Sequence, residues 1–339
     1  MRILLLRTDR LGDVVLATPV IRALRTNYPD SYIAMVVRPY TVDVVKSNPD
    51  LNEVIIYDKE NEHKGLFATL KFALSLKNKK FDIALALHPE TRAHIIMFAA
   101  GIKKRVGYDR KLKELLTLKI PHVKQKGLMH EAEYNMDMLK RAGFEISGAA
   151  YRPYMRTEDV ERKLVDTLLK ENKVSRDFVA IHVGASCSSK RWPAERFAET
   201  AEYITSKLGF DVILVGDAGT VPLNKKIVEK TAKKIYDFSD MLRVGELAEL
   251  LKRAKLFISN DSGPVHVAVA VGTPVISIFG RKDPGLSPKR WGPLGARDIV
   301  LHKDAGCQKC LAHNCVKGFA CLELITVQDV IRAAEDILT

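Results

Sequence analysis

The sequence at residues 259–266 reads Ser259-Asn260-Asp261-Ser262-Gly263-Pro264-Val265-His266. It follows an apolar run at 255–259, which is typical of a buried strand, and it leads into an apolar segment that predicts a helix. Asp261 or Ser262 can cap that helix, and the amides of its first turn suit a diphosphate. His266 lies about one turn further on, where it either faces such a ligand or packs in the core. The junction predicts an α/β sheet with an anion site beyond the carboxyl end of a strand.

The same alternation of strand and helix occurs in two rounds along the chain. Buried strands are predicted at 2–6, 32–37, 53–57, 82–87, 178–183, 211–215, 255–259 and 274–279. Helical patterns separate them, at 65–77, 194–207, 222–233 and 245–253. A chain of 339 residues also exceeds what one compact core usually holds. We therefore expect an α/β fold of two Rossmann-like, doubly wound domains, at 1–155 and 156–339, joined by a linker near 148–163, with a ligand cleft between them.

The chain is strongly basic, with 54 Lys and Arg against 41 Asp and Glu and a net charge of +13. Residues 77–141 hold 15 basic and 7 acidic side chains, so this stretch alone carries a charge of +8. A solvated basic surface explains any single lysine there. The clustering in one half favours a polyanionic partner, such as nucleic acid, anionic lipid or a phosphorylated substrate.

No apolar run approaches the roughly 20 residues that a membrane-spanning helix needs. The apolar core of the N-terminus, residues 2–6, is too short for a secretory signal and predicts a buried strand. We therefore expect a cytoplasmic protein that can also associate with a membrane surface. The five cysteines should then be reduced.

The loop after the first predicted strand runs from Arg7 to Asp13 and enters a helix that includes Pro19. Asp13 falls at or near the helix start, where a carboxylate either caps the helix or takes a proton from a substrate hydroxyl. Position alone favours the cap. Arg7 and Arg10 lie in the same loop and would suit an anionic substrate.

Two further loops follow predicted strands of the second half. The first carries Gly184 and Ser186, small residues that let backbone amides approach a phosphate, and then Lys190, which adds charge. The second is Gly216-Asp217-Ala218-Gly219, which lacks the full glycine fingerprint of a dinucleotide site. Asp217 could bind a ribose hydroxyl or cap the next helix.

Four cysteines lie close together near the C-terminus, at Cys307, Cys310, Cys315 and Cys321. Four thiols in such a short stretch could bind zinc or an iron–sulfur cluster as a structural metal site. The spacings fit no standard zinc motif, and reduced structural thiols are the main alternative.

Together these motifs resemble glycosyltransferase family nine, the lipopolysaccharide heptosyltransferases. The resemblance extends from the first strand to the last helix. It rests on Leu11-Gly12-Asp13-Val14 with Pro19, the loop from Gly184 to Pro193, Asp261-Ser262-Gly263-Pro264 with His266, and the late cysteines. It implies the GT-B fold, with an acceptor-binding first half and a second half that binds a nucleotide sugar. The last helix, near 326–338, would pack back on the first half.

The resemblance also implies the reaction. Heptose would pass from ADP-heptose to a phosphorylated, lipid-linked core sugar, with inversion and without a cofactor or a catalytic metal. Asp13 would be the general base and Arg7 and Arg10 would bind the acceptor, while the basic stretch 77–141 would meet an anionic lipid at the inner face of the cytoplasmic membrane.

The same resemblance assigns the donor site to the second half of the chain. Lys190 and the amides around Ser262 and Gly263 would hold the diphosphate, and Asp261 and His266 would line the same site. Gly184, Ser186 and Asp217 complete the predicted donor-binding set.

Three alternatives remain open on the sequence. One is a GT-B glycosyltransferase with another nucleotide sugar. A nicotinamide dehydrogenase is disfavoured by the missing glycine fingerprint after the first strand. A nucleic-acid-binding protein with a metal at the cysteines is suggested by the charge, but no nucleic-acid module is recognisable, and we expect no nucleic acid partner.

Overall fold

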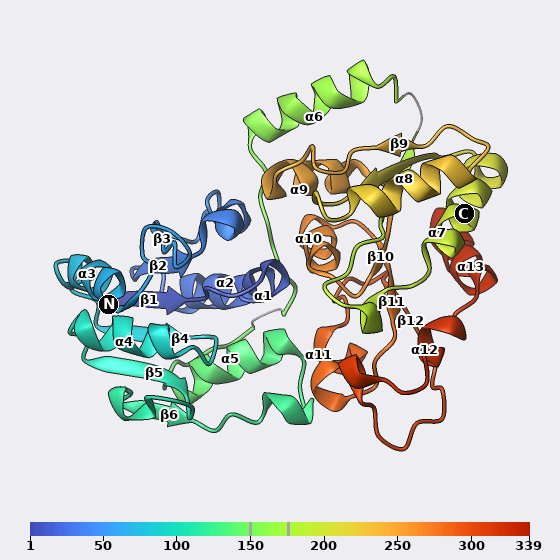
Figure 1. Ribbon diagram of the computed structural model, residues 1–339. Coiled ribbons are helices and arrows are strands. Elements are labelled where there is room, and N and C mark those ends of the chain that lie inside the picture. The colour runs from blue at the N-terminus through green and yellow to red at the C-terminus, as the bar shows by residue number, and fades with distance from the viewer. Residues whose placement is uncertain (149–150, 175–176) are drawn as a thin grey trace. The chain divides into compact units, whose positions relative to one another are not determined.

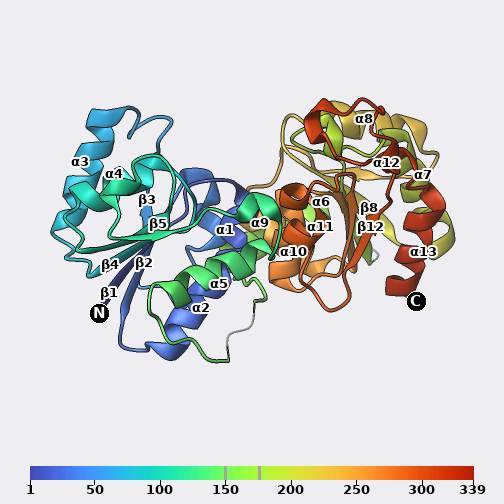
Figure 2. The same ribbon diagram turned by 90° about the horizontal axis from the view of Figure 1, so that it is seen from below.

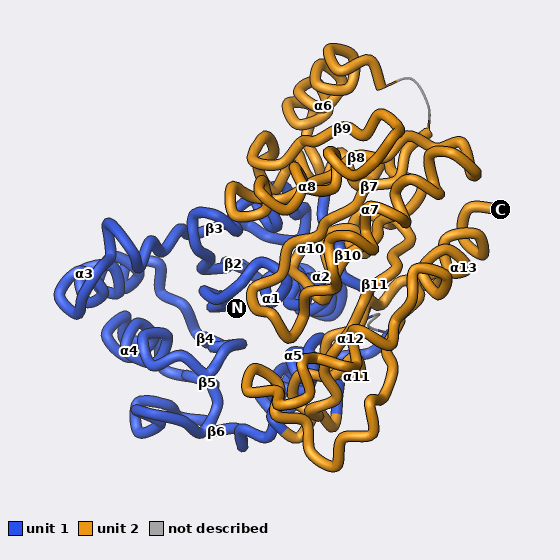
Figure 3. Tube along the Cα trace, turned by 45° about the vertical axis from the view of Figure 1, so that its right-hand side comes forward, with its two compact units in different colours: residues 1–125, 129–156 blue, residues 126–128, 157–339 orange. Residues whose placement is uncertain are grey.

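The computed structural model describes residues 1–148, 151–174 and 177–339 (Figure 1). The chain divides into two compact units (Figure 3). Unit 1 comprises residues 1–125 and 129–156, and unit 2 comprises residues 126–128 and 157–339. Residues 149 and 150, within the predicted linker, lie outside the described residues.

Unit 1 contains a parallel six-stranded sheet in the order β3-β2-β1-β4-β5-β6. The strands are β1 (Arg2–Leu6), β2 (Tyr32–Val37), β3 (Glu53–Ile56), β4 (Ile83–Ala86), β5 (Lys104–Tyr108) and β6 (Leu118–Ile120). The helices are α1 (Leu11–Val15), α2 (Thr18–Asn27), α3 (Leu66–Lys77), α4 (Thr91–Ala99) and α5 (Glu131–Arg141). Helices α3 and α4 lie over one face of the sheet, and α2 and α5 lie over the other (Figure 2).

Unit 2 repeats this plan with a parallel sheet in the order β12-β11-β10-β7-β8-β9. The strands are β7 (Phe178–His182), β8 (Asp211–Val215), β9 (Tyr236–Asp237), β10 (Leu256–Asn260), β11 (Val275–Phe279) and β12 (Ile299–His302). The helices are α6 (Asp159–Glu171), α7 (Ala194–Tyr203), α8 (Val221–Lys230), α9 (Val244–Arg253), α10 (Gly263–Val271), α11 (Pro288–Trp291), α12 (Ala320–Glu323) and α13 (Val327–Leu338). The prediction of two Rossmann-like halves is confirmed.

Both sheets have the strand order that defines a doubly wound fold, with reversal points between β1 and β4 and between β7 and β10. Central strands such as β7 and β10 are buried along their whole length, as a sheet covered on both faces requires. Loops that leave the carboxyl ends of these four strands therefore converge at one point in each unit.

The sequence missed β5, β6, β9 and β12. Strands β6 and β9 have three and two residues at the sheet edges, and β5 begins with two charged side chains. Short or half-exposed strands leave no continuous apolar run. The helix predicted after the first loop is also interrupted, because α1 ends at Val15 and α2 begins at Thr18, with Pro19 in its first turn.

Helix α13 packs on the sheet of unit 2. Its residues Val330, Ala333 and Ala334 are buried in the same apolar core as Ile276 of β11 and Phe197 of α7. The apolar face of α13 is therefore buried against the core of unit 2. The expectation that this last helix packs on the first half stays a prediction.

No helix in the described ranges 1–148, 151–174 and 177–339 is long and apolar enough to cross a membrane.

Candidate functional site

The reversal point of unit 1 holds a buried charged cluster centred on Arg7, which directly follows β1. The Arg7 guanidinium is 1% exposed, and each of its three nitrogens donates to the protein. Nε donates to Asp9 Oδ1 at 2.8 Å, and Nη2 donates to Asp13 Oδ1 at 2.5 Å. Both terminal nitrogens lie 3.1–3.2 Å from Glu131 Oε1. We call Arg7, Asp9, Asp13 and Glu131 the Arg7 cluster.

Helix α5 and the loop after β4 complete these surroundings. Glu131 opens α5, where the helix dipole favours a carboxylate, and it also accepts from Lys124 Nζ at 2.6 Å. Arg7 Nη1 donates to the Leu87 carbonyl at 2.8 Å and to Asn135 Oδ1 at 3.1 Å. The side chain that was predicted to bind an acceptor is thus engaged by the protein's own groups, which suits a role in holding Asp13.

Burial changes the protonation of the cluster. It raises the pKa of Asp9 to about 7, although the charge of Arg7 opposes this shift. His88 Nδ1 lies 3.1 Å from Asp9 Oδ2, and burial followed by the positive charge of Arg7 lowers the pKa of His88 to about 3. The imidazole is therefore neutral at pH 7.

Asp13 is oriented by Arg7 and is not the helix cap. Arg10 occupies the N-cap position of α1, which makes Asp13 the third residue of the helix. The Asp13 side chain is 15% exposed, and among the described residues only its Oδ1 accepts a hydrogen bond. Its second oxygen is left for another partner. Arg10 is exposed.

The reversal point of unit 2 holds a second cluster, centred on Asp261 at the end of β10. Asp261 Oδ2 lies 3.0 Å from Lys190 Nζ and 2.7 Å from Arg281 Nη2. The side chains of Asp261 and Arg281 are 7% and 5% exposed, and that of Lys190 is 16% exposed. Two cations share one carboxylate here, which leaves one positive charge in excess. We call these three residues the donor cluster, after the donor site that the sequence predicts here.

Helix α10 begins beside this cluster. Ser262 is its N-cap residue, and Gly263 and Pro264 follow in the first turn. No side chain of the described residues caps this end. The positive end of the helix dipole therefore adds to the excess charge of the donor cluster.

A hydroxyl–imidazole network supports the same turn. Ser262 Oγ lies 2.9 Å from Ser259 Oγ, and both hydroxyls lie 3.3 Å from His182 Nδ1. Burial lowers the pKa of His182 to about 4, against the opposing charge of Asp217. The network is therefore uncharged at neutral pH. His266 is buried, with 4% exposure, one turn into α10.

The shifted pKa of His182 predicts an acid-sensitive fold. In the unfolded chain the His182 imidazole binds a proton near pH 6.5, whereas in the native protein it does so only near pH 4. The free energy of unfolding is therefore unaffected by this group above pH 6.5 and decreases as the pH falls from 6.5 towards 4. The loss attributable to this group is about 3 kcal/mol. Urea midpoints at pH 7 and pH 4 should differ less for His182→Asn than for the wild type. If the urea midpoints of the two proteins depended equally on pH, His182 would not be the cause of the acid sensitivity.

The remaining predicted residues lie in loops around the donor cluster. A side chain at Gly184 would come within 2.8 Å of Thr220 Oγ1 and 2.9 Å of His182 Nε2, so glycine permits a close approach of two loops. Asp217 is exposed and accepts from Thr220 Oγ1 at 2.9 Å, while Thr220 itself holds the N-cap position of α8. Ser186 is exposed.

Sequence reasoning assigned no role to Arg281, His182 or Glu131. Arg281 follows β11 by two residues, and His182 is the last residue of β7, so a search of every strand end would have found both. Glu131 gave no such signal, because it opens a helix rather than following a strand.

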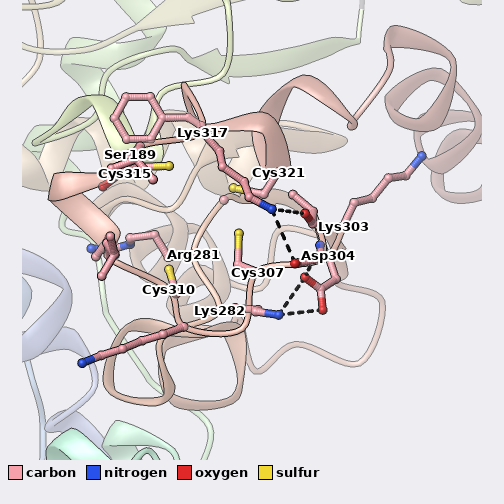
Figure 4. Close-up of a pocket in the computed structure, with 18 of the residues that line it drawn as sticks. Ser189, Arg281, Lys282, Lys303, Asp304, Cys307, Cys310, Cys315, Lys317 and Cys321 are labelled. Atoms are coloured by element: carbon pink, nitrogen blue, oxygen red, sulfur yellow. Dashed lines mark hydrogen bonds and ion pairs between the residues drawn. The ribbon is translucent and has the colours of Figure 1, made fainter.

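The four late cysteines line a single cavity of about 520 Å³ in unit 2 (Figure 4). Ser189, Arg281 and Lys282 line the same cavity, so it adjoins the donor cluster. Burial raises the pKa of the Cys321 thiol, and the charges of Cys315 and Cys310 add to the shift. In the described part of the chain, no three His, Cys, Asp or Glu side chains are placed to hold a metal ion.

We expect the thiols to be reduced and metal-free in the purified protein. Elemental analysis should then find no stoichiometric zinc or iron, and a thiol reagent should titrate all five cysteines after unfolding. Dialysis against a chelator should leave the melting temperature unchanged, because no metal–thiolate bond would be lost. One metal ion per chain, lost together with stability, would instead establish the structural metal site.

The chain resembles known proteins over almost its whole length. The profile of Glycosyltransferase family 9 (heptosyltransferase) matches residues 69–320. Lipopolysaccharide heptosyltransferase 3 of Escherichia coli K12 is 27% identical, with 96% of this chain and 95% of that protein covered. A family 9 glycosyl transferase structure from Veillonella parvula is 26% identical, with a TM-score of 0.88 and 99% and 97% coverage.

A solved structure of the E. coli ADP-heptose lps heptosyltransferase II shares the fold. Its TM-score is 0.82 at 21% identity, with 100% of this chain and 98% of that chain covered. The GT-B architecture expected from the sequence is thereby confirmed. The family profile spans well over half of the chain, and the protein belongs to glycosyltransferase family 9, the heptosyltransferases.

Proposed function

We propose that this protein transfers heptose from ADP-heptose to a phosphorylated, lipid-linked core sugar of lipopolysaccharide, with inversion at the anomeric carbon. The observation that carries the proposal is the donor cluster, in which Lys190 and Arg281 share Asp261 beside the start of α10. Family membership and the resemblance to E. coli heptosyltransferases support the choice of sugar and acceptor.

The donor cluster suits a diphosphate because its charges do not balance. When a nucleotide sugar reacts, negative charge develops on the leaving diphosphate, and fixed cations near that oxygen lower the barrier. Lys190, Arg281 and the amides around Gly263 offer this charge without a catalytic metal or another cofactor. Asp261 holds the two cations in place.

The remaining donor contacts follow from the loops beside the donor cluster. Gly184 and Ser186 offer backbone amides to the diphosphate, Ser262 adds its amide, and Asp217 reaches the ribose. We also assign to this site His266, which is buried one turn into α10.

The acceptor side of the reaction is assigned to the Arg7 cluster. Asp13 takes the proton of the acceptor hydroxyl as its oxygen bonds to the anomeric carbon and the bond to the ADP oxygen breaks. A single displacement of this kind inverts the anomeric configuration. Arg7 fixes Asp13 Oδ1 and leaves Oδ2 for the proton, while the exposed Arg10 attracts the acceptor phosphate.

The proposed acceptor is amphipathic, so we place the protein in the cytoplasm, at the inner face of the cytoplasmic membrane. The charge of +8 on residues 77–141 supports contact with anionic lipid or with the acceptor phosphates. No nucleic acid partner is proposed.

Calorimetric titration with ADP, UDP, GDP and NAD, in buffer with a chelator, tests the donor assignment. We expect selective ADP binding, weakened about tenfold to a hundredfold in Lys190→Ala by loss of a charge-assisted hydrogen bond. Lys255→Ala is the matched control, because Lys255 pairs with Asp177 just before β10 begins, at the other end of that strand. Preference for UDP or GDP would change the donor, and NAD binding or the absence of any binding would refute the assignment.

A further inference from the structure

Helix α3 of unit 1 presents apolar side chains to solvent as well as to the core. Its inner face, made by Thr69, Phe72, Ala73 and Leu76, is buried, and Phe72, Ala73 and Leu76 join the core under the sheet. Its outer face exposes Phe67 at 89%, Leu66 at 58% and Leu74 at 56%. A helix that only covered a sheet would carry polar residues there.

Lysines surround these exposed apolar residues. Residues 63–81 contain five lysines and no acidic residue. Lys79 pairs with Glu53 at 2.5 Å, whereas the other four are exposed and form no ion pair with any described residue. We call the exposed apolar residues together with these four lysines the α3 surface: Leu66, Phe67, Leu74, Lys64, Lys71, Lys77 and Lys80.

Helix α4 lies beside α3 on the same face of the sheet (Figure 2). It exposes Phe98 at 53%, and the guanidinium of Arg105 lies 5.4 Å from the centre of that ring. The next exposed side chains along the chain are Lys103 and Lys104. The outer layer of unit 1 thus repeats the combination of an exposed aromatic ring with cations.

We propose that the α3 surface docks on an anionic lipid bilayer, an inference that rests on the proposed lipid-linked acceptor. Phe67 and Leu66 enter the boundary between headgroups and acyl chains, and the lysines bind lipid phosphates. A protein partner fits less well, because protein interfaces are depleted in lysine at their core. An aromatic ring framed by lysines without acidic side chains complements an anionic membrane.

Sedimentation with phosphatidylcholine vesicles, with and without phosphatidylglycerol, tests this surface on the full chain. The wild type should bind only the anionic vesicles, and binding should weaken as salt screens the lysines. The Phe67→Ser/Lys71→Glu variant should bind at least about tenfold more weakly, since each basic residue contributes about 1 kcal/mol at such a surface and an aromatic anchor is lost.

The matched control is Leu164→Ser/Lys163→Glu, because both residues are exposed on α6 of unit 2. This control should bind vesicles like the wild type. ADP affinity, measured for every variant, tests the donor site independently, and circular dichroism tests whether each variant folds. Wild type that ignores anionic vesicles, or a Phe67→Ser/Lys71→Glu variant that binds them unchanged, would overturn the docking surface. Vesicle binding without ADP binding would leave the α3 surface standing and refute the proposed donor.

Discussion

Replacement of Asp13 by alanine is expected to lower the transfer rate by about a hundredfold to ten-thousandfold, the usual contribution of a general base. ADP affinity should stay within about twofold of the wild type, because the donor cluster lies in unit 2 and Asp13 in unit 1. The structure favours this role because Arg7 fixes one oxygen of the carboxylate at 2.5 Å. A base that is already oriented pays little entropy when the acceptor arrives.

The rate should be measured from ADP release at saturating donor. Asp13→Asn keeps the shape and the hydrogen bond to Arg7 but cannot take a proton, so it should be as slow as the alanine variant. Asp137→Ala on α5 is the matched control, because among the described residues this half-exposed carboxylate pairs with Arg141 alone. Turnover near the wild-type rate in Asp13→Asn would remove Asp13 as the base.

Replacement of Arg7 by methionine should destabilise unit 1 by about 3–5 kcal/mol at pH 7, the usual cost of stranding a buried charge. The variant keeps most of the apolar stem but leaves Asp9 and Glu131 without their shared cation. The charge of Arg7 opposes the raised pKa of Asp9, so this pKa should rise further in the variant, and its native state should bind a proton at higher pH than the wild type does. The deficit in stability should therefore shrink as the pH falls from 7 to 5.

Urea unfolding at both pH values, followed by fluorescence and circular dichroism, measures this deficit. Arg105→Met is the comparison within unit 1, because Arg105 donates to the backbone carbonyls of Leu115 and Ile102 rather than to carboxylates. Its cost should be about 1–2 kcal/mol. Glu131→Gln introduced into the Arg7→Met protein should restore part of the lost stability. A deficit that does not depend on pH would show that Arg7 acts through packing alone.

Transfer by the Arg7→Met variant separates positioning from acceptor binding. Loss of positioning should lower kcat, since Asp13 would no longer be oriented. Loss of an acceptor contact should mainly raise KM. We expect the kcat effect, because every nitrogen of Arg7 is already occupied within the protein.

Local patterns in the sequence were enough for most of the strand–helix plan and for the candidate loops that follow the central strands. Buried strands such as β7 and β10 are continuous apolar runs, and the turn at Asp261 and Gly263 carries the small and capping residues that a helix start needs. Apolar runs and capping residues can each be recognised within a few neighbouring residues. Edge strands such as β6 and β9 were missed because they are too short to form an apolar run.

Only the tertiary structure decided which charges meet. Lys190, Asp261 and Arg281 follow three different strands, and strand order brings them together. Arg7 could be read from the sequence as a free cation, yet Glu131, which is 124 residues away, occupies it. Ionic pairs across a fold depend on the order and register of distant strands, and no local pattern encodes either. The sequence by itself therefore determined the scaffold and its candidate loops, and the tertiary structure decided the partner of each charged side chain.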